Sequence, residues 1–255
     1  MTEHEKEHAP AEPAAPAVLA VDVGGSHVKM LLNGATERRR FVSGKSLTPG
    51  DMASGVLERT NDWSYEVVSV GVPAPVLSGR LVHDPANLGK GWVGFDFEAA
   101  FGKPTKVIND AAMQALGSYE GGRMLFLGLG TGLGSAMIVD GILAPMELAH
   151  LPFRRGTFED YIGIKGMKKL GLKRWRKTVR ETIAVLVAAL EPEYVVLGGG
   201  NADQMDKLPP NVRLGYNEDA FLGGFRLWID ELDGSRASVG AGAVAPRNVE
   251  TTPDP

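Results

Sequence analysis

An acidic residue between an apolar strand and a helix is the part of this sequence best suited to chemistry. Asn109 and Asp110 directly follow the apolar pair Val107–Ile108, and a helix-like run begins at Ala111. Asp110 has two interpretations at this junction. It is either a helix N-cap, because an Asp there accepts a hydrogen bond from a first-turn N–H, or a general base at the carboxyl end of a strand, where open α/β sheets bind their ligands.

A glycine-rich turn earlier in the chain can hold phosphate. The apolar run Val18–Val23 is followed by Gly24-Gly25-Ser26, and a second strand then resumes at Met30. The tip of such a hairpin exposes backbone N–H groups that can bind phosphate oxygens. A plain turn explains the glycines equally well. Asp22 favours phosphate binding, because a carboxylate inside an apolar strand costs several kcal/mol unless it is paired or binds a cation.

A second glycine-rich hairpin lies after Asp110. The strand Met124–Leu129 runs into Gly130-Thr131-Gly132, and another strand follows. A dinucleotide-binding turn needs a helix after its glycines, and a P-loop needs Gly-Lys-Ser/Thr, so both are excluded. The strand Tyr194–Leu197 ends in Gly198-Gly199-Gly200, where a flat ligand or a phosphate can lie close to the backbone.

Further polar candidates lie in the connecting segments. The loop 83–94 is rich in Gly, Asn and Asp, and offers Asn87 and Trp92 as contacts, although Trp92 can equally be a packing residue. Glu147 and His150 are three residues apart, which places both on one side of a helical turn. Together they can hold two sugar hydroxyls or a metal, or form a surface ion pair. Glu159 follows Thr157, the predicted N-cap of the next helix.

The composition limits the class of protein. A chain of 255 residues with 44% apolar residues forms one large domain or two small ones. The net charge of −4 disfavours a general nucleic-acid binder. The chain has no cysteine, which excludes disulfides, thiolate metal sites and cysteine nucleophiles. It also lacks an apolar run of about 18 residues and a secretory h-region, so we expect no membrane span and a cytoplasmic location.

One segment departs from the acidic balance of the chain. Residues 165–180 contain Lys and Arg with no acid among them. A nucleic acid, a polyanionic substrate and a plain solvated helix face all fit this pattern.

Taken in order, these motifs resemble the signatures of ROK-type sugar kinases. The resemblance rests on Asp22-Val-Gly-Gly-Ser, Asn109-Asp110, Gly128-Leu-Gly-Thr-Gly, Glu147-Leu-Ala-His150 and Gly198-Gly-Gly, and spans residues 18–232. It implies an α/β protein with the two-domain actin/hexokinase-like (ribonuclease H-like) fold and a central cleft. The expected domains are a small one over residues 18–109, completed by a helix over 219–232, and a larger one over 110–218. Residues 1–17 and 247–255 are expected to be disordered tails.

The chain departs from most of this family in three ways. ROK proteins usually carry a cysteine-rich zinc motif after the His, and residues 151–157 replace it here, so no structural zinc is expected. The usual Glu-Leu-Gly-His has Ala149 in its third position. No DNA-binding segment precedes the first strand, which disfavours the repressor branch. A short chain without the zinc motif looks like the polyphosphate glucokinase branch.

The resemblance assigns a role to each candidate. Asp110 is the base that accepts the proton of the sugar 6-hydroxyl, and Mg²⁺ binds between the phosphates, through water to Asp22. The sugar ligands are Asn87, Asn109, Glu147, His150 and Glu159. The phosphate and nucleotide ligands are Asp22, Gly24, Gly25, Ser26, Lys29, Gly130, Thr131, Gly132, Gly198, Gly199 and Gly200.

These roles leave substrate and partners open. Glucose is the expected sugar, with fructose, mannose and amino sugars as alternatives, and the donor is polyphosphate, ATP or both. A non-catalytic sugar sensor, a nucleic-acid-associated protein and an acyl-phosphate enzyme are the rival functions. The intact Asp110 counts against a sensor, and the polyol-type ligands Glu147 and His150 count against acyl-phosphate chemistry. The family suggests a homodimer and implies neither a nucleic-acid nor a membrane partner.

Overall fold

The computed structural model describes residues 16–216 and 218–229, which fold as two compact units. The first contains residues 16–118, 215–216 and 218–229, and the second contains residues 119–214. The units divide after Ser118, whereas the sequence predicts a boundary after Asn109. The helix that begins at Asp110 stays with the first unit because it packs on a helix from near the end of the chain. Of the two predicted tails, only residues 16–17 belong to the described part.

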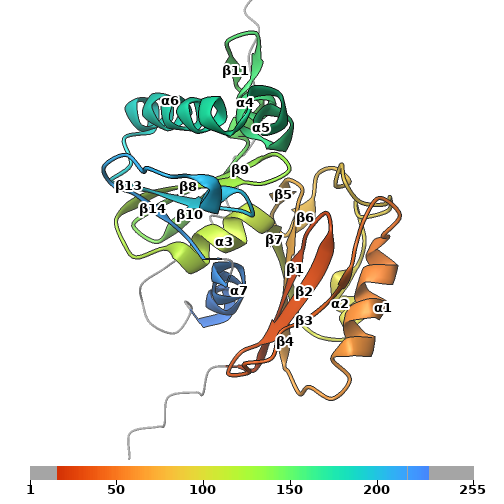
Figure 1. Cartoon of the computed structure of the whole chain (residues 1–255). Coiled ribbons are helices and arrows are strands. Elements are labelled where there is room, and N and C mark those ends of the chain that lie inside the picture. The colour runs from red at the N-terminus through yellow and green to blue at the C-terminus, as the bar shows by residue number, and fades with distance from the viewer. Residues whose placement is uncertain (1–15, 217, 230–255) are drawn as a thin grey trace, which may run out of the picture. The chain divides into compact units, whose positions relative to one another are not determined.

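The first unit is built on a five-stranded sheet with the order β3-β2-β1-β4-β7 (Figure 1). Its strands are β1 (Val18–Val23), β2 (His27–Leu32), β3 (Arg39–Val42), β4 (Val67–Val72) and β7 (Thr105–Asn109). β1 pairs antiparallel with β2 and β2 with β3, whereas β1, β4 and β7 are parallel. The carboxyl ends of these three parallel strands therefore share one edge of the sheet.

Helices cover both faces of this sheet (Figure 1). α1 (Pro49–Arg59) and α2 (Phe97–Phe101) pack on one face, where Val21, Val70 and Met52 are buried together. α3 (Asp110–Ser118) and α7 (Asp219–Ile229) lie on the other. The short hairpin of β5 (Val76–Leu77) and β6 (Arg80–Leu81) follows β4.

Small residues let α3 and α7 approach closely. A Cβ atom on Gly223 would overlap the Met113 carbonyl oxygen, and one on Gly117 would overlap the Asp219 carbonyl oxygen. Close packing is the prediction that the Gly223-Gly224 pair makes, and it is confirmed. The prediction that the helix extends to residue 232 concerns positions that lie in part outside the described residues.

The second unit repeats the same sheet order, β10-β9-β8-β13-β14. Its strands are β8 (Arg123–Leu129), β9 (Leu133–Val139), β10 (Ile142–Met146), β13 (Tyr194–Gly198) and β14 (Val212–Leu214). β8, β9 and β10 are antiparallel neighbours, while β8, β13 and β14 are parallel. Short elements connect them: η1 (Leu148–His150), β11 (Pro152–Phe153), β12 (Gly156–Thr157) and η2 (Ala202–Gln204).

Three consecutive helices belong to the second unit (Figure 1): α4 (Phe158–Ile162), α5 (Ile164–Leu170) and α6 (Leu172–Leu190). α6 buries Trp175, Val179, Ile183 and Leu186, whose spacing of three and four residues places them on one face. This face packs on apolar side chains of β8 and β13. Within the described part of the chain, no helix combines the length and apolar character needed to span a bilayer.

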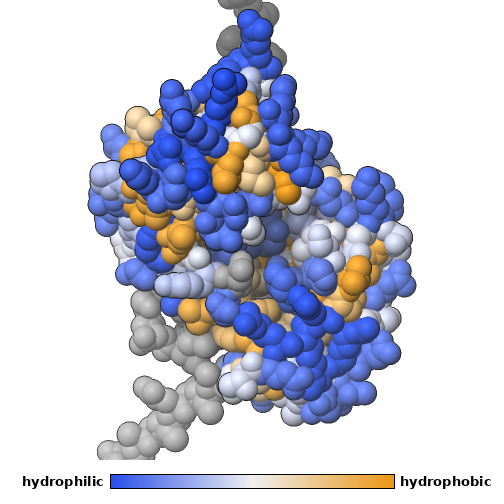
Figure 2. All heavy atoms as spheres, viewed as in Figure 1, coloured by the Kyte–Doolittle hydropathy of each residue, from blue (hydrophilic) through white to orange (hydrophobic). Residues whose placement is uncertain are grey.

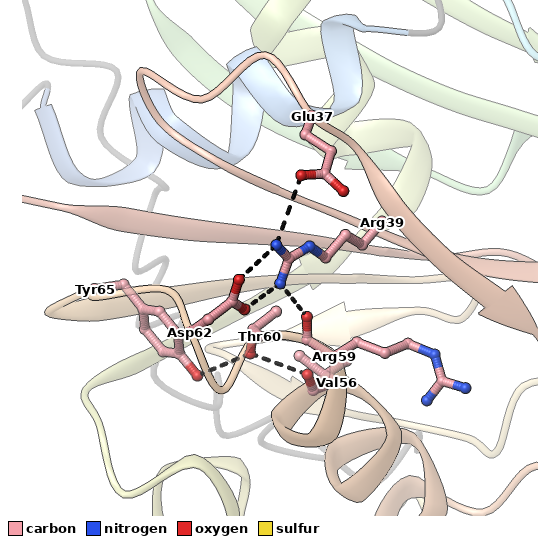
Figure 3. Close-up of polar contacts among 7 residues, drawn as sticks. All are labelled: Glu37, Arg39, Val56, Arg59, Thr60, Asp62 and Tyr65. Atoms are coloured by element: carbon pink, nitrogen blue, oxygen red, sulfur yellow. Dashed lines mark hydrogen bonds and ion pairs between the residues drawn. The ribbon is translucent and has the colours of Figure 1, made fainter.

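The edge strand β3 is fixed by an arginine that is saturated with protein contacts (Figure 3). The Arg39 guanidinium pairs with the Asp62 carboxylate, donates to the Arg59 carbonyl oxygen at 2.6 Å and lies 4.2 Å from the Trp63 ring centroid. The hydrogen bond from Arg39 lowers the pKa of the Asp62 carboxyl. A shallow hollow lined by residues 37–40, 59 and 61–62 lies here, and Figure 2 shows a hydrophilic surface over this edge. Charged side chains on an edge strand oppose pairing with another chain, so we assign this cluster a structural role.

Candidate active site

The first candidate centre lies at the carboxyl edge of the first sheet, around a glycine. Gly71 on β4 is the register partner of Asp22 on β1, and it also lies beneath the start of α3. A Cβ atom on Gly71 would overlap the Met113 side chain and lie 3.5 Å from the Asp110 Cα. A larger residue at this position would have to displace the Met113 side chain, which packs against Gly71 at the start of α3. Gly71 therefore lies between the two candidate acids, Asp22 and Asp110.

Asp110 is the first residue of α3. The hydrogen bonds that cap this helix are shared between Asp110 and Asn109. The Asn109 Oδ1 accepts from the Ala112 N–H at 3.1 Å, and its Nδ2 donates to the Ala74 carbonyl oxygen at 3.2 Å. The Asp110 Oδ1 accepts from the adjacent Ala111 N–H at 2.8 Å. A cap bond to the third helical residue is the usual N-cap contact, and here Asn109 makes it. The N-cap interpretation thus applies better to Asn109 than to Asp110.

Asp22 is paired with a cation. The Lys29 Nζ, across the β1–β2 hairpin, lies 3.3 Å from the Asp22 Oδ2, and the Asp22 side chain is 17% exposed while that of Lys29 is 43% exposed. Burial raises the pKa of the Asp22 carboxyl, and the charge and hydrogen bond of Lys29 offset part of that rise. The pair places one buried negative charge and one solvated positive charge beside the hairpin tip.

Hydrogen bonds fix the base of the first hairpin tip, whereas its outer residues are open to solvent. The Gly24 N–H donates to the His27 carbonyl oxygen at 2.9 Å, and the Ser43 Oγ donates to the Gly24 carbonyl oxygen at 2.6 Å. Gly25 and Ser26 are exposed. A Cβ atom on Gly25 would lie 3.5 Å from the Cβ of Asn87, so the tip and this candidate sugar ligand are neighbours.

Trp92 is a packing residue. Its side chain is fully buried, and its ring lies 6.4 Å from that of Phe97. The Trp92 N–H donates to the Asp84 Oδ1 at 2.8 Å, which fixes the loop. Asn87 in the same loop is exposed, so Asn87 is the available ligand and Trp92 supports it from the core.

The second candidate centre is the tip of the β8–β9 hairpin. The Gly130 N–H donates to the Gly132 carbonyl oxygen at 3.1 Å. Asn201, in the segment between β13 and η2, fixes the tip: its N–H donates to the Leu129 carbonyl oxygen at 2.9 Å and its Nδ2 to the Gly130 carbonyl oxygen at 3.0 Å. Gly199 has φ +80° and a Cβ atom there would lie 2.6 Å from the Leu129 carbonyl oxygen. The segment Gly198–Gly200 therefore lies directly against this hairpin.

Three polar candidates gather in the second unit beside that tip. The His150 Nε2 and the Glu147 Oε2 are 4.0 Å apart, with exposed fractions of 74% and 52%. The Glu159 Oε2 lies near the Leu133 N–H at 3.4 Å, and a Cβ atom on Gly132 would overlap this carboxylate. Partial burial raises the pKa of Glu147, His150 lowers it, and Glu159 raises it. The contact between Glu147 and His150 is loose enough to leave both side chains free for a polyol.

The acids of these sites suit a metal that is only partly held by protein. Among residues 16–216 and 218–229, no group of three or more His, Asp or Glu side chains could enclose an ion. Mg²⁺ keeps most of its waters and binds through one or two carboxylates and substrate phosphates. Asp22, a single buried carboxylate beside a glycine-rich tip, fits this kind of site.

The basic run is only partly neutralised by protein. Arg176 and Arg180 of α6 pair with Asp206 at 3.0 and 3.2 Å, and Lys177 lies 3.8 Å from Glu181. Besides Lys165, four other cations of the run are exposed and have no ion pair within the described residues: Lys168, Lys169, Lys173 and Arg174. α5, which carries the first two of them, begins at the second hairpin, where the Ile164 N–H donates to the Thr131 carbonyl oxygen at 3.3 Å.

Sequence reasoning overlooked three residues that shape these sites. Gly71 has a sequence signal, because an isolated glycine in an apolar strand indicates close backbone approach. Asn201 directly follows the glycine triplet, but nothing in the sequence near it identifies the residues it bonds to. The Ser135 Oγ donates to the Met146 carbonyl oxygen at 2.8 Å and accepts from the Leu148 N–H at 3.1 Å, which fixes the segment around Glu147. A lone serine in a strand gives no signal of this.

Comparison with known proteins points to one group. No protein-family model matches the chain. A polyphosphate glucokinase of Mycobacterium tuberculosis is 26% identical over 74% of this chain and 80% of its own length. An inorganic polyphosphate/ATP-glucomannokinase of Arthrobacter has a solved structure that matches 84% of this chain and 98% of its own, with a TM-score of 0.72 and 27% identity.

A more distant structure shares the fold alone. The ROK family glucokinase of Streptomyces griseus, solved in complex with glucose and AMPPNP, has a TM-score of 0.67. It is 15% identical and matches 83% of this chain and 99% of its own. The two five-stranded units are thus the α/β architecture of these kinases.

Proposed function

We propose that this chain, which has the actin/hexokinase-like fold of the ROK sugar kinases and resembles their polyphosphate glucokinase branch, phosphorylates glucose at its 6-hydroxyl. The donor is polyphosphate, ATP or both. The observation that carries the proposal is the position of Asp110, at the carboxyl edge of the first sheet, with Gly71 between it and Asp22. A carboxylate at a strand end with a phosphate-type hairpin on the same sheet is what this reaction needs.

The chemistry assigned to Asp110 is proton acceptance. As the sugar 6-oxygen forms its bond to the terminal phosphorus, the Asp110 carboxylate takes the hydroxyl proton. The bond from that phosphorus to the bridging oxygen breaks, and ADP or a polyphosphate shorter by one unit leaves. Phosphoryl transfer depends mostly on positioning and charge neutralisation, so one oriented base is sufficient.

The other candidates bind and orient. Neutral amides and carboxylates suit a polyol, because each buried hydroxyl needs a donor and an acceptor. We assign this role to Asn87 and Asn109 in the first unit and to Glu147, His150 and Glu159 in the second.

The glycine-rich tips are assigned to phosphate. Their ligands are Gly24, Gly25, Ser26 and Lys29 in one unit, and Gly130, Thr131 and Gly132 in the other, with Gly198, Gly199 and Gly200 alongside. A divalent metal, which we propose to be Mg²⁺ held by Asp22 through water, would neutralise phosphate charge when bound.

The substitution Asp110→Asn tests this assignment. Asn keeps the size of the side chain and an oxygen for the Ala111 N–H, so folding and glucose binding should persist. Turnover should fall by about 10²–10⁴-fold, the usual contribution of a general base. Calorimetry with glucose and a product assay on the same preparation separate the two effects. Turnover within a few-fold of wild type would reduce Asp110 to a helix residue.

The choice of donor depends on the basic run. Polyphosphate carries charge along its length and gains from cations spread along a path, as single-stranded nucleic acids do. We propose that Lys168, Lys169, Lys173 and Arg174 line such a path. They are exposed and have no ion pair within the described residues, and the first residue of α5, Ile164, bonds to Thr131. The alternative is a solvated helix face.

Replacing these four residues by Gln should raise the KM for polyphosphate and flatten its salt dependence, while the KM for ATP changes little. Arg176→Gln with Arg180→Gln is the matched control, because both side chains already pair with the Asp206 carboxylate. Equal effects on both donors, or no effect on either, would leave the run as surface charge and ATP as the default donor.

Another hexose remains the second candidate substrate, favoured by the relative that is named a glucomannokinase. A homodimer, which the family suggests, is likewise a proposal, and its test is sedimentation equilibrium.

A further inference from the structure

A short hairpin separates the candidate sugar ligands of the second unit. β11 and β12 pair antiparallel, with Pro152 opposite Thr157 and Phe153 opposite Gly156. Glu147 and His150 come just before this hairpin, and Glu159 comes just after it. Its two ends are joined, because the Phe158 N–H donates to the Leu151 carbonyl oxygen at 3.2 Å. Whatever fixes the hairpin therefore fixes both groups of ligands.

Arg154 at the turn of this hairpin reaches three elements. Its guanidinium pairs with the Glu181 carboxylate on α6. The guanidinium carbon also lies 5.0 Å from the ring centroid of Phe153 and 5.3 Å from that of Tyr161 on α4. An arginine suits this position, because its planar cation stacks on rings and pairs with a carboxylate at the same time.

The aromatic rings form a second layer of the same contact. Phe153 packs on Phe158 at a centroid distance of 4.9 Å and meets Tyr161 edge-on at 5.5 Å. Both partners belong to α4, the helix that carries Glu159. The hairpin is thus attached to α4 through its rings and to α6 through its cation.

The backbone of Arg154 indicates that these contacts are specific. Its φ is +55°, a left-handed conformation that is uncommon for arginine. Such a conformation persists where the surrounding contacts determine it. Glycine or asparagine would adopt it more readily, so the contacts of the arginine side chain offset the cost of this conformation.

From this arrangement we infer that Arg154 is a positioning residue for sugar binding: its contacts with Glu181, Phe153 and Tyr161 hold the hairpin that sets Glu147, His150 and Glu159. The inference rests on the proposed function, since these three residues are its sugar ligands. It adds a residue that touches neither sugar nor phosphate in that assignment.

The test replaces Arg154 by Asn, which accepts the left-handed backbone and loses the cation. Arg154→Asn should raise the dissociation constant and the KM for glucose by about 3–10-fold, the factor expected from an exposed ion pair and cation–π contacts together. The KM for ATP or polyphosphate should not change. Arg154→Lys keeps the charge but stacks poorly, so it should recover part of the glucose affinity.

Two further variants complete the design. Arg155→Asn is the matched control: its exposed side chain makes no ion pair within the described residues, and it should bind glucose as wild type does. Glu181→Gln should weaken glucose binding in the same way as Arg154→Asn, and the double variant should add little, because paired residues are not additive.

The outcomes are distinct. If wild type binds glucose and Arg154→Asn binds it as tightly as Arg155→Asn does, the inference is wrong. If Arg154→Asn lowers the Tm but leaves glucose affinity unchanged in the folded range, Arg154 is structural only, and the inference is also wrong. If wild type binds no sugar in calorimetry, the proposed function fails before this variant is measured.

Discussion

The sheets of the two units have the same strand order but carry different residues at equivalent positions. Asp22 is the next-to-last residue of β1 and faces Lys29 across its hairpin. Gly128 is the next-to-last residue of β8 and faces Gly134 across the other hairpin. Both strands lead into tips of similar composition, Gly24–Ser26 and Gly130–Gly132. One unit therefore has a charged pair where the other has a pair of glycines.

This difference separates what the fold needs from what the chemistry needs. The second hairpin forms without any charge at this position, so the Asp22–Lys29 pair is not required to build the sheet. A buried carboxylate also opposes stability, since its transfer from water is costly. We therefore interpret Asp22 and Lys29 as the phosphate and metal end of the site.

The second hairpin depends on backbone contact in place of charge. Asn201 bonds to two of its carbonyl oxygens, and Gly199 lies against Leu129 where a Cβ atom would collide. The first tip has no comparable constraint at Gly25, which is exposed. Substitution should therefore destabilise the segment beside the second tip more than the first tip.

Among the variants that test the contrast between the two units, the largest effect is expected from Asp22→Asn. Activity should fall by about 10–100-fold, as for other residues that hold a metal through a second layer of contacts. Stability at neutral pH should rise. Burial raises the pKa of Asp22 in the folded protein, so above the unfolded-state pKa the folded chain binds more protons, and stability falls as pH rises toward the raised value. The neutral Asn removes this cost.

The measurements for Asp22→Asn are a product assay and thermal unfolding across pH. Asp203→Asn, which removes an exposed acid from the other unit, is the control. A lower Tm together with full activity would make Asp22 a structural residue and would erase the contrast between the units.

A smaller effect, on stability, is expected from Gly199→Ala. The φ of +80° and the collision with Leu129 should cost about 1–3 kcal/mol of unfolding free energy. Gly25→Ala is the matched variant in the first tip and should change stability by less than about 0.5 kcal/mol. Denaturant unfolding of both variants measures the difference. Equal costs would show that the second tip is not specially constrained.

A pH shift, smaller than the two effects above, is expected from Lys29→Gln. Lys29 lowers the pKa of Asp22, so its removal should raise that pKa further. Activity that needs the ionised carboxylate should then begin to fall at a higher pH on the acid side. A pH profile of kcat/KM for the phosphoryl donor measures this shift. If the fall in kcat/KM at low pH occurs at the same pH as in wild type, Lys29 does not affect the titration of Asp22 in the active protein.

The sequence predicts those parts of the fold and the candidate site that depend on neighbouring residues. Three features are found as predicted: the end of a strand just before Asp110, the two glycine-rich tips, and Thr157 as an N-cap. Each depends on a few adjacent residues. The sequence offers Asp110 as the N-cap, whereas Asn109 makes the bond to the third helical residue. Asn and Asp both cap helices, so only the geometry distinguishes them.

Long-range contacts lie beyond such reasoning. The first unit extends to Ser118 because α3 packs on α7, and the glycines signal close packing without naming the partner. The attachment of Asn201 to Gly130 and of Arg154 to Glu181 joins segments far apart in the sequence. No local pattern identifies which residues will meet in this way.

The central claim is that this chain transfers a phosphoryl group to a sugar hydroxyl. The direct test incubates the wild-type protein and Mg²⁺ with glucose, fructose, mannose or glucosamine and either ATP or polyphosphate, and identifies the products by ³¹P NMR. We predict glucose 6-phosphate as the main product with at least one donor. If no sugar phosphate forms in any combination, the proposed function is wrong, and a sugar-sensing role becomes the better account of the same residues.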